Sequence, residues 1–281
     1  MKYPKILLTG GTGQVGYRLK KELAIFGKIF SPGRKEFDLT NFQSMRKIIR
    51  GLKPSLIVNA AAYTEVDLSE VNFALALKIN AKAPKILAEE ASKLNIPLIH
   101  FSTDYVFDGT LKRSYKEDDV PNPINFYGKS KLAGENAIKK NYNHFIIIRT
   151  GWVYDANRGK NFYQTMLKLF KEKKEIQVVN DQYGCPTSAK FIAKQIVKVL
   201  NKLNLNLTDE NRWGTYHLTE HKIMTWFNFA KKIFILEKSS IKNKKLKIIP
   251  IRSKNYPTLA KRPVNSVLNL KKIKSNFLNR N

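Results

Sequence analysis

TGGTGQVG, residues 9–16, decides the fold, because it joins a short apolar run at 5–8 to a helical pattern at 16–26. Its glycines have the G-x-x-G-x-x-G spacing. In a strand–turn–helix unit they permit a tight turn, a close approach of backbone to pyrophosphate, and close packing of helix on strand. The helix N-terminus then offers N–H groups and a positive dipole end to the phosphates. The stretch therefore predicts a dinucleotide-binding site.

Strand and helix patterns alternate outward from this stretch. We expect strands at 5–8, 28–31, 55–59, 97–102 and 144–149, and helices at 16–26, 42–51, 72–94, 127–140 and 190–203. This alternation favours parallel strands with right-handed crossovers. It predicts the α/β class: a Rossmann-like doubly wound parallel sheet with a smaller C-terminal substrate-binding lobe. We expect the NAD(P)-binding lobe at 1–150 and about 186–214, and the substrate-binding lobe at 151–185 and about 215–281.

The second expected strand is followed by Ser31-Pro32-Gly33-Arg34-Lys35. A site for NAD usually has an acidic side chain here for the ribose 2′-hydroxyl, whereas an arginine accommodates the 2′-phosphate of NADP. Arg34 therefore favours NADPH, with NADH left open. The alternative is that Arg34 is an ordinary surface cation, one of 51 basic residues. The carboxylate of Asp38 can cap Thr40-Asn41 or meet the adenine.

Tyr127 and Lys131 are four residues apart on an expected helix, so both lie on one face. A neighbouring cation favours the phenolate, so we expect Lys131 to lower the tyrosine pKa from its usual value near 10. Tyr127 can then donate a proton to a carbonyl oxygen as hydride reaches the carbon, and Lys131 can hold the nicotinamide ribose. The spacing alone also fits a surface tyrosine beside a solvated lysine, since the chain has 12 tyrosines.

The strand context supports the catalytic interpretation. The strand at 97–102 delivers Thr103 and Asp104 to the carboxyl end of the sheet, where doubly wound folds bind ligands. Thr103 can hydrogen-bond the same carbonyl oxygen and orient it. Residues 60–62 are three alanines after the third strand, and such small side chains would let a cofactor pass close to the backbone.

The formal charge of +29 comes from 51 basic and 22 acidic residues. No RNA-binding or helix-turn-helix motif accompanies it, so we interpret the charge as compositional and expect no nucleic-acid partner, although a basic surface can steer an anionic nucleotide. Cys185 is the only cysteine, which excludes an intrachain disulfide. No apolar run approaches the ~20 residues that a membrane helix needs. We expect a cytoplasmic enzyme with no membrane partner.

Beyond the glycine turn, specific motifs extend across nearly the whole chain. They are VNAAAYTEVD at 58–67, FSTDYVFDG at 101–109, YGKSKLAGE at 127–135, RTGWVY at 149–154, NDQYGCPT at 180–187 and RPVNSVL at 262–268. With these motifs the sequence resembles the extended short-chain dehydrogenase/reductases and, within them, the dTDP-4-dehydrorhamnose reductase family. The resemblance implies reduction of the 4-keto group of a dTDP-linked 6-deoxyhexulose to dTDP-L-rhamnose.

The resemblance also implies roles for individual residues. Tyr127 would be the proton donor, Lys131 its partner and Thr103 the third catalytic residue, with Thr103, Asp104 and Trp152 at the sugar. An aromatic face such as that of Trp152 can pack on the apolar side of a deoxysugar, or it can be ordinary core. Combined with the glycine turn, the expected cofactor-binding residues are Gly10, Gly13, Gln14, Val15, Gly16, Arg34, Asp38, Leu39, Ala60, Ala61, Ala62, Tyr63, Thr64, Tyr127 and Lys131.

Three positions depart from the family pattern. Gly151 stands where family members commonly have serine, which is expected to enlarge the pocket. Some members bind magnesium through carboxylates, but the corresponding positions hold Arg18 and Lys190, and cations repel a divalent ion. We therefore expect no metal and no need for magnesium. The sequence ends at Asn281, before the family's last helix, which puts the family's usual homodimer in doubt.

Two other functions remain as alternatives at this point. One is a reductase of another nucleotide-linked 4-keto-6-deoxysugar, because the motifs specify neither base nor stereochemistry. The other is a non-catalytic regulatory relative that binds NADP. The presence of Thr103, Tyr127 and Lys131 together argues against the second alternative.

Overall fold

A six-stranded parallel sheet forms the centre of the computed structural model, which describes residues 3–203, 207, 212–239, 241 and 246–279. The strand order is β10-β5-β4-β3-β1-β2. The strands are β1 (Lys5–Thr9), β2 (Lys28–Phe30), β3 (Leu56–Asn59), β4 (Leu98–Thr103), β5 (Phe145–Thr150) and β10 (Gly214–His217). Strand order reverses between β1 and β3, and ligands bind in the crevice outside the carboxyl ends of strands at such a point. The predicted doubly wound α/β fold is confirmed.

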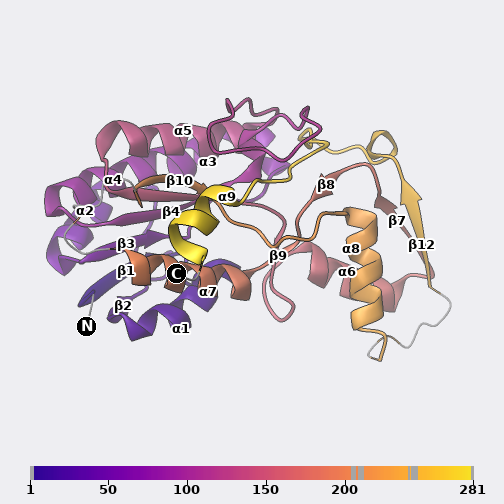
Figure 1. Ribbon diagram of the computed structural model, residues 1–281, viewed down its shortest axis with the longest axis horizontal. Coiled ribbons are helices and arrows are strands. Elements are labelled where there is room, and N and C mark those ends of the chain that lie inside the picture. Colours follow the sequence, from indigo (N-terminus) through magenta and orange to yellow (C-terminus); the bar gives the residue numbers. More distant parts are fainter. Residues whose placement is uncertain (1–2, 204–206, 208–211, 240, 242–245, 280–281) are drawn as a thin grey trace.

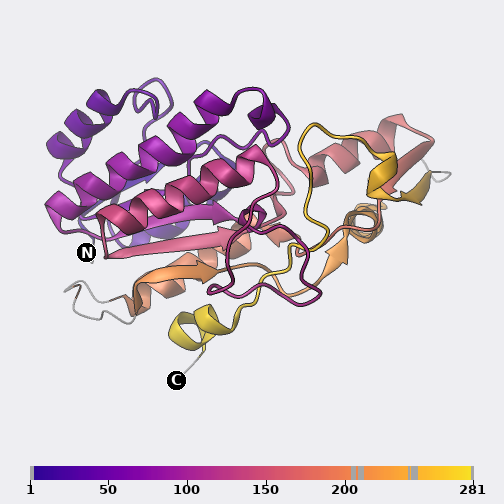
Figure 2. The ribbon, with the colours of Figure 1, turned by 90° about the horizontal axis from the view of Figure 1, so that it is seen from above.

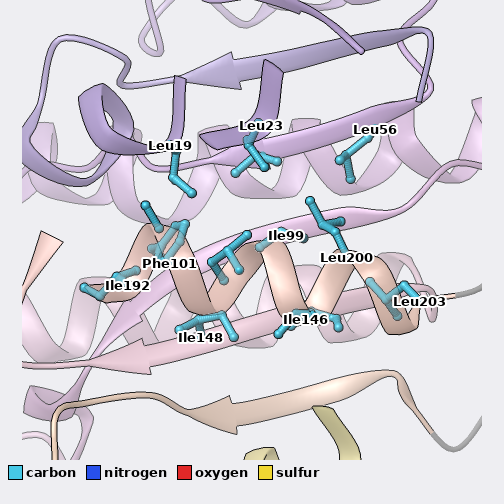
Figure 3. Packing of buried hydrophobic residues seen from close by; sticks show 14 of the residues in the cluster. Leu19, Leu23, Leu56, Ile99, Phe101, Ile146, Ile148, Ile192, Leu200 and Leu203 are labelled. Atoms are coloured by element: carbon cyan, nitrogen blue, oxygen red, sulfur yellow. The ribbon is translucent and has the colours of Figure 1, made fainter. Parts of the chain in front are cut away.

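Helices cover both faces of this sheet (Figure 1). On one face lie α1 (Gln14–Glu22), continued by η1 (Leu23–Ile25), and α7 (Ala189–Lys202). On the other lie α2 (Phe42–Leu52), α4 (Ala83–Leu94) and α5 (Phe126–Asn141). Figure 3 shows the first interface, where Ile192 and Leu200 of α7 belong to the same buried cluster as Ile146 and Ile148 of β5. Each fully buried side chain of this kind contributes roughly 1.5–3 kcal/mol, so these layers hold the strand ends in place.

One helix predicted at 72–94 is interrupted in the structure. It consists of α3 (Phe73–Leu77), a π-helical turn η3 (Lys78–Lys82) and α4. The turn carries Asn80, which accepts from the Tyr63 N–H at 2.8 Å and donates to the Tyr63 carbonyl at 3.0 Å. It also donates to the Ser130 hydroxyl at 2.9 Å. The π-turn thus ties the loop after β3 to α5, in keeping with the frequent occurrence of such turns at functional sites.

A smaller lobe lies beyond one end of the sheet (Figure 2). Its own core packs α6 (Phe162–Glu172) and α8 (Trp226–Leu236) against the parallel pair β7 (Glu175–Val179) and β12 (Lys247–Ile251). Two short pairs join it to the sheet: β6 (Val153–Tyr154) with β9 (Thr187–Ser188), and β8 (Tyr183–Gly184) with β11 (Met224–Thr225). Short 3-10 turns lie at η2 (Leu68–Glu70), η4 (Asp104–Val106) and η6 (Ser253–Asn255).

The last part of the chain does not follow the predicted division at about residue 215. Strand β10 belongs to the large sheet, and α9 (Lys271–Ile273) with η7 (Lys274–Leu278) packs on that sheet through Ile273 and Phe277. Lys272 Nζ donates to the Thr215 carbonyl at 2.9 Å. The prediction that assigned both segments to the smaller lobe is wrong in this respect, because their apolar side chains complete the core on the α7 side of the sheet.

Candidate active site

The glycine turn between β1 and α1 is shaped for a phosphate. Gly10 has φ +71°, and a Cβ there would lie 2.6 Å from the Ala61 nitrogen. A Cβ on Gly16 would lie 2.1 Å from the Gly10 carbonyl oxygen. Helix α1 begins at Gln14, and its N-cap Gly13 provides no side-chain acceptor for the first-turn N–H groups. An anion suits such N–H groups, so the residues present fit a dinucleotide pyrophosphate.

Two of the other predicted cofactor residues, Ala60 and Ala61, lie directly against this turn, 2.6–2.7 Å from the position of a Gly10 Cβ. Ala60, Ala61 and the loop up to Thr64 follow β3, and the loop continues past Tyr63, which Asn80 holds. Asp38 accepts from the backbone N–H and the hydroxyl of Thr40, both at 2.8 Å, and these hydrogen bonds lower its pKa. Asp38 therefore caps its own loop, one of the two roles open from the sequence.

The loop after β2 presents its cations to solvent. Arg34 and Lys35 are exposed, and the Gly33 N–H donates to the Glu36 carboxylate at 2.7 Å. An exposed arginine at this point can reach a ribose phosphate, while the nearby Glu36 carboxylate would oppose one.

Thr103 and Tyr127 meet at the carboxyl end of β4. Thr103 is the last residue of β4, and Tyr127 is the second residue of α5. Asn125 caps this helix by accepting from the Gly128 N–H at 2.8 Å, which fixes where the tyrosine emerges. Thr103 lies close enough to the Tyr127 hydroxyl to lower its pKa, and Thr103 donates to Asp104 Oδ1 at 3.0 Å. The structure thus brings three predicted site residues together.

The predicted lowering of the Tyr127 pKa is wrong. Burial and, to a smaller extent, the charge of Asp104 raise the pKa of Tyr127 to about 12, against the opposing effect of Thr103. The Lys131 amine donates to the Phe101 carbonyl at 2.6 Å, and burial lowers its pKa to about 8. Desolvation is the largest cause of both shifts. Tyr127 consequently keeps its proton at neutral pH, as a proton donor must.

Asp104 is a buried carboxylate with one oxygen left over. It is 2% exposed, and its Oδ2 accepts no hydrogen bond. Burial raises its pKa to about 6, against the opposing effects of Ser266 and Thr103. A buried polar atom without a partner is costly, so Oδ2 is suited to a donor from a ligand hydroxyl.

The absence of a side chain at Gly151 leaves the space that the Asp104 carboxylate occupies. A Cβ on Gly151 would lie 2.3 Å from Asp104 Oδ2, so any larger residue would displace the carboxylate. The expectation of a larger pocket is therefore wrong in part: the Asp104 carboxylate takes up the space that a serine side chain would need.

Trp152 follows in a left-handed conformation, with φ +51°. Its ring stacks on that of Trp226, with centroids 3.4 Å apart and planes 2° apart. Phe162 packs against Trp226, with the two ring centroids 4.6 Å apart. The aromatic stack fixes Trp152 in orientation and joins it to α8 of the smaller lobe. Trp226 has no distinguishing motif in the sequence and was not predicted as part of the site.

The two cations at the positions of the family's metal-binding carboxylates have different surroundings. Arg18 donates to both oxygens of Asp155, at 2.5 and 2.8 Å, and Lys190 is exposed. Across the described ranges, no group of three His, Cys, Asp or Glu side chains could hold a metal ion. Independence from magnesium stays a prediction, to be checked by assay after exhaustive chelation. Among the described residues, no helix is long and apolar enough to cross a membrane.

Known proteins match the chain over nearly its whole length. The family described as RmlD substrate binding domain matches residues 4–281. The dTDP-4-dehydrorhamnose reductase of Salmonella typhimurium is 40% identical over 277 residues, which cover 97% of this chain and 91% of that protein. A crystal structure of the reductase of that name from Clostridium acetobutylicum has a TM-score of 0.87 at 38% identity, over 95% of this chain and 91% of the other. The Bacillus anthracis structure, solved in complex with NADP, has a TM-score of 0.87 at 35% identity, over 98% and 93%.

The fold and the Tyr127–Lys131–Thr103 arrangement define a Rossmann-like protein of the short-chain dehydrogenase/reductase type. Within that class, the chain belongs to the RmlD substrate binding domain family, in which the relatives above are named dTDP-4-dehydrorhamnose reductases.

Proposed function

We propose that this protein uses NADPH to reduce the 4-keto group of a dTDP-linked 6-deoxyhexulose, giving dTDP-L-rhamnose. The observation that carries the proposal is the cluster of Thr103, Asp104 and Tyr127 at the carboxyl end of β4, together with the phosphate-shaped turn. The family relatives support the choice of sugar, and the NADP-bound relative supports the choice of cofactor.

Tyr127 is the acid of the reaction. NADPH, when bound, would supply the hydride to the carbonyl carbon, and negative charge would then develop on the carbonyl oxygen. Tyr127 is protonated at working pH, so its hydroxyl can pass a proton to that oxygen. Thr103 lies next to the same hydroxyl, so it can hydrogen-bond the carbonyl oxygen and keep that oxygen aligned with the donor.

Lys131 stabilises the phenolate that remains. Its amine lies one helical turn from Tyr127 and is buried, so its ammonium form acts in a medium where charge interactions are strong. Its remaining N–H is available to the nicotinamide ribose. The glycine turn and the free N–H groups of α1 would hold the pyrophosphate, and the loop from Ala60 to Thr64 would line the cofactor.

The sugar is proposed to lie between Asp104 and Trp152. Asp104 Oδ2 can accept from a sugar hydroxyl, and the indole ring can cover the apolar side of a deoxysugar. Because Trp152 is stacked on Trp226, its ring has little freedom to turn away from the site.

The test is to incubate the purified protein with dTDP-4-keto-6-deoxyglucose, the matching epimerase and NADPH, and to identify the sugar formed. We expect NADPH oxidation and stoichiometric dTDP-L-rhamnose. If NADPH is oxidised only with a different nucleotide-linked 4-keto-6-deoxysugar, that sugar is the substrate and the one proposed here is wrong. NADPH binding without oxidation of any such substrate would support the non-catalytic alternative.

A further inference from the structure

The Lys131 amine contacts a buried histidine, His100, which has no role in the mechanism above. His100, in the middle of β4, is 1% exposed, and its Nε2 lies 3.3 Å from Lys131 Nζ. The carbonyl of Phe101 accepts from the same amine at 2.6 Å. Lys131 is itself 1% exposed, so these two neighbours determine where its nitrogen lies.

His100 is fixed in turn by Asn59 at the end of β3. Asn59 Nδ2 lies 2.8 Å from His100 Nδ1. Asn59 Oδ1 accepts from the Thr9 hydroxyl at 2.6 Å and from the Ala61 N–H at 3.3 Å. A buried chain of side chains therefore runs across the sheet from Thr9, next to the phosphate turn, to Lys131 on α5.

This chain selects one tautomer of the histidine. A backbone N–H can only donate, so the Ala61 contact fixes the Asn59 amide with Oδ1 toward Ala61 and Nδ2 toward His100. The Nδ2 group also can only donate, so His100 Nδ1 must accept. Burial lowers the pKa of His100 well below its usual value, which keeps the ring neutral. Its one proton then lies on Nε2 and points at Lys131.

We infer that His100 is a positioning residue for Lys131: its Nε2–H, set by Asn59, donates to the Lys131 amine whenever that amine is deprotonated, and so stabilises the neutral form relative to the ammonium. The significance of this contact for catalysis rests on the proposed function. A neutral amine can accept from His100, donate to the Phe101 carbonyl and keep one N–H for a ligand. An ammonium has no lone pair, so one of its N–H groups would instead point at the Nε2–H of His100 and the two would repel each other.

The other charged neighbour of Lys131 acts in the opposite direction. Glu135, one turn further along α5, favours the ammonium, but its carboxylate is already paired with Arg149 at 2.7 Å. Tyr127, one turn back, is neutral at working pH. Burial outweighs Glu135 and lowers the pKa of Lys131 to about 8. With the further help that we infer from His100, Lys131 can release and regain its proton near neutral pH, which a reusable partner of Tyr127 requires.

Two measurements on the protein alone test the inference. The first is a long-range ¹H–¹⁵N spectrum of ¹⁵N-histidine-labelled protein, which distinguishes Nε2–H from Nδ1–H rings. The chain has four histidines, so the His100 signals can be assigned by elimination with variants of the other three. We expect the Nε2–H pattern, and an Nδ1–H pattern would overturn the inference.

The second measurement is the titration of Lys131 in protein labelled with [ε-¹³C]lysine, assigned by loss of the signal in Lys131→Met. His100→Phe keeps a ring in the site and removes the donor. We expect it to move the Lys131 midpoint upward by about half to one pH unit, the size of one lost hydrogen bond. His217→Phe is the matched control: His217 is also fully buried in the sheet, but its ring nitrogen faces the Tyr115 carbonyl, so the midpoint should stay.

An unchanged or lower Lys131 midpoint in His100→Phe would contradict the inference. If His100→Phe does not fold, the tautomer of the native protein still decides it. Neither measurement uses sugar or NADPH, so failure of the proposed reduction leaves both results standing. Conversely, an active reductase with an Nδ1–H His100 would retain the proposed function and lose only this inference.

Discussion

Two buried carboxylates on neighbouring elements have opposite surroundings. Glu135 on α5 accepts from the Ser102 hydroxyl at 2.6 Å and from Arg149 at 2.7 and 2.9 Å, so both of its oxygens are paired. Asp104 has one oxygen paired with Thr103 and the other with nothing. Although burial raises the pKa of both, Arg149 and Ser102 bring that of Glu135 below its usual value, whereas that of Asp104 rises to about 6.

This difference indicates that Glu135 serves to stabilise the fold, whereas Asp104 is available to bind a ligand. Ser102 and Thr103 are consecutive residues of β4, so their side chains point to opposite faces of the sheet. Ser102 contacts Glu135, whose charge is paired with Arg149 within the fold. Thr103 contacts Asp104, whose Oδ2 has no hydrogen-bond partner in the protein and can accept from a ligand. The predictions below test this division.

The largest effect is expected on stability, from Glu135→Gln. Removing the charge leaves the Arg149 guanidinium, 1% exposed, without its counter-charge. Breaking a buried pair in this way costs about 3–5 kcal/mol, measured by denaturant unfolding. Glu89→Gln is the control, because Glu89 pairs with Arg46 nearer the surface and should cost at most about 1 kcal/mol. Equal losses in the two variants would contradict the comparison.

Tyr127→Phe, in contrast, is expected to lower activity and to leave stability unchanged. The variant keeps the ring and its packing but removes the proton donor, so kcat should fall by at least about 100-fold, equivalent to about 2.7 kcal/mol. Its unfolding free energy and its affinity for NADPH should stay close to those of the native protein. Single-turnover hydride transfer together with a cofactor titration measures both, and transfer at the native rate would remove Tyr127 from the mechanism.

Asp104 should make stability depend on pH. Its pKa rises from 3.8 unfolded to about 6 folded, so its contribution is fully present below about pH 4 and is lost as pH rises through 6. The shift of about two units corresponds to about 3 kcal/mol. Asp104→Asn should remove this component, so native protein should lose more stability than the variant between pH 4 and pH 8. Parallel pH profiles for the two proteins would contradict the raised pKa.

The smallest effect concerns the choice of cofactor. NADPH should be preferred over NADH, and Arg34→Ala should reduce that preference about tenfold by removing a charged contact to the 2′-phosphate. Lys35→Ala, also exposed and adjacent, is the control and should change little. The measurement is kcat/KM with each cofactor. Equal values for the native protein would show that Arg34 is an ordinary surface cation.

The sequence predicts the parts of this molecule that depend on local pattern. The glycine spacing and the apolar run before it suffice for β1, the turn and α1. Strand β10 was missed because its four residues, GTYH, have no alternation and are held by pairing with β5, more than 60 residues earlier in the chain. The final segment was misassigned for the same reason, since its contacts with the large sheet are not local.

The site shows the same limit. Spacing predicts that Tyr127 and Lys131 share a face, but burial, which sets both pKa values, depends on tertiary packing. The contact between Gly151 and Asp104 joins two strand ends and leaves no local pattern. His100 could have been noticed as a polar residue within an apolar strand, although nothing local identifies Lys131 as its neighbour.

The most direct test of the central claim follows the hydride itself. Native protein is supplied with NADPH carrying two deuterium atoms at C4 of the nicotinamide, together with dTDP-4-keto-6-deoxyglucose and the matching epimerase. The product is then examined by NMR and mass spectrometry. Our account predicts dTDP-L-rhamnose with one deuterium from the cofactor at C4 of the sugar. A product without cofactor-derived deuterium, or with it at another carbon, would contradict it.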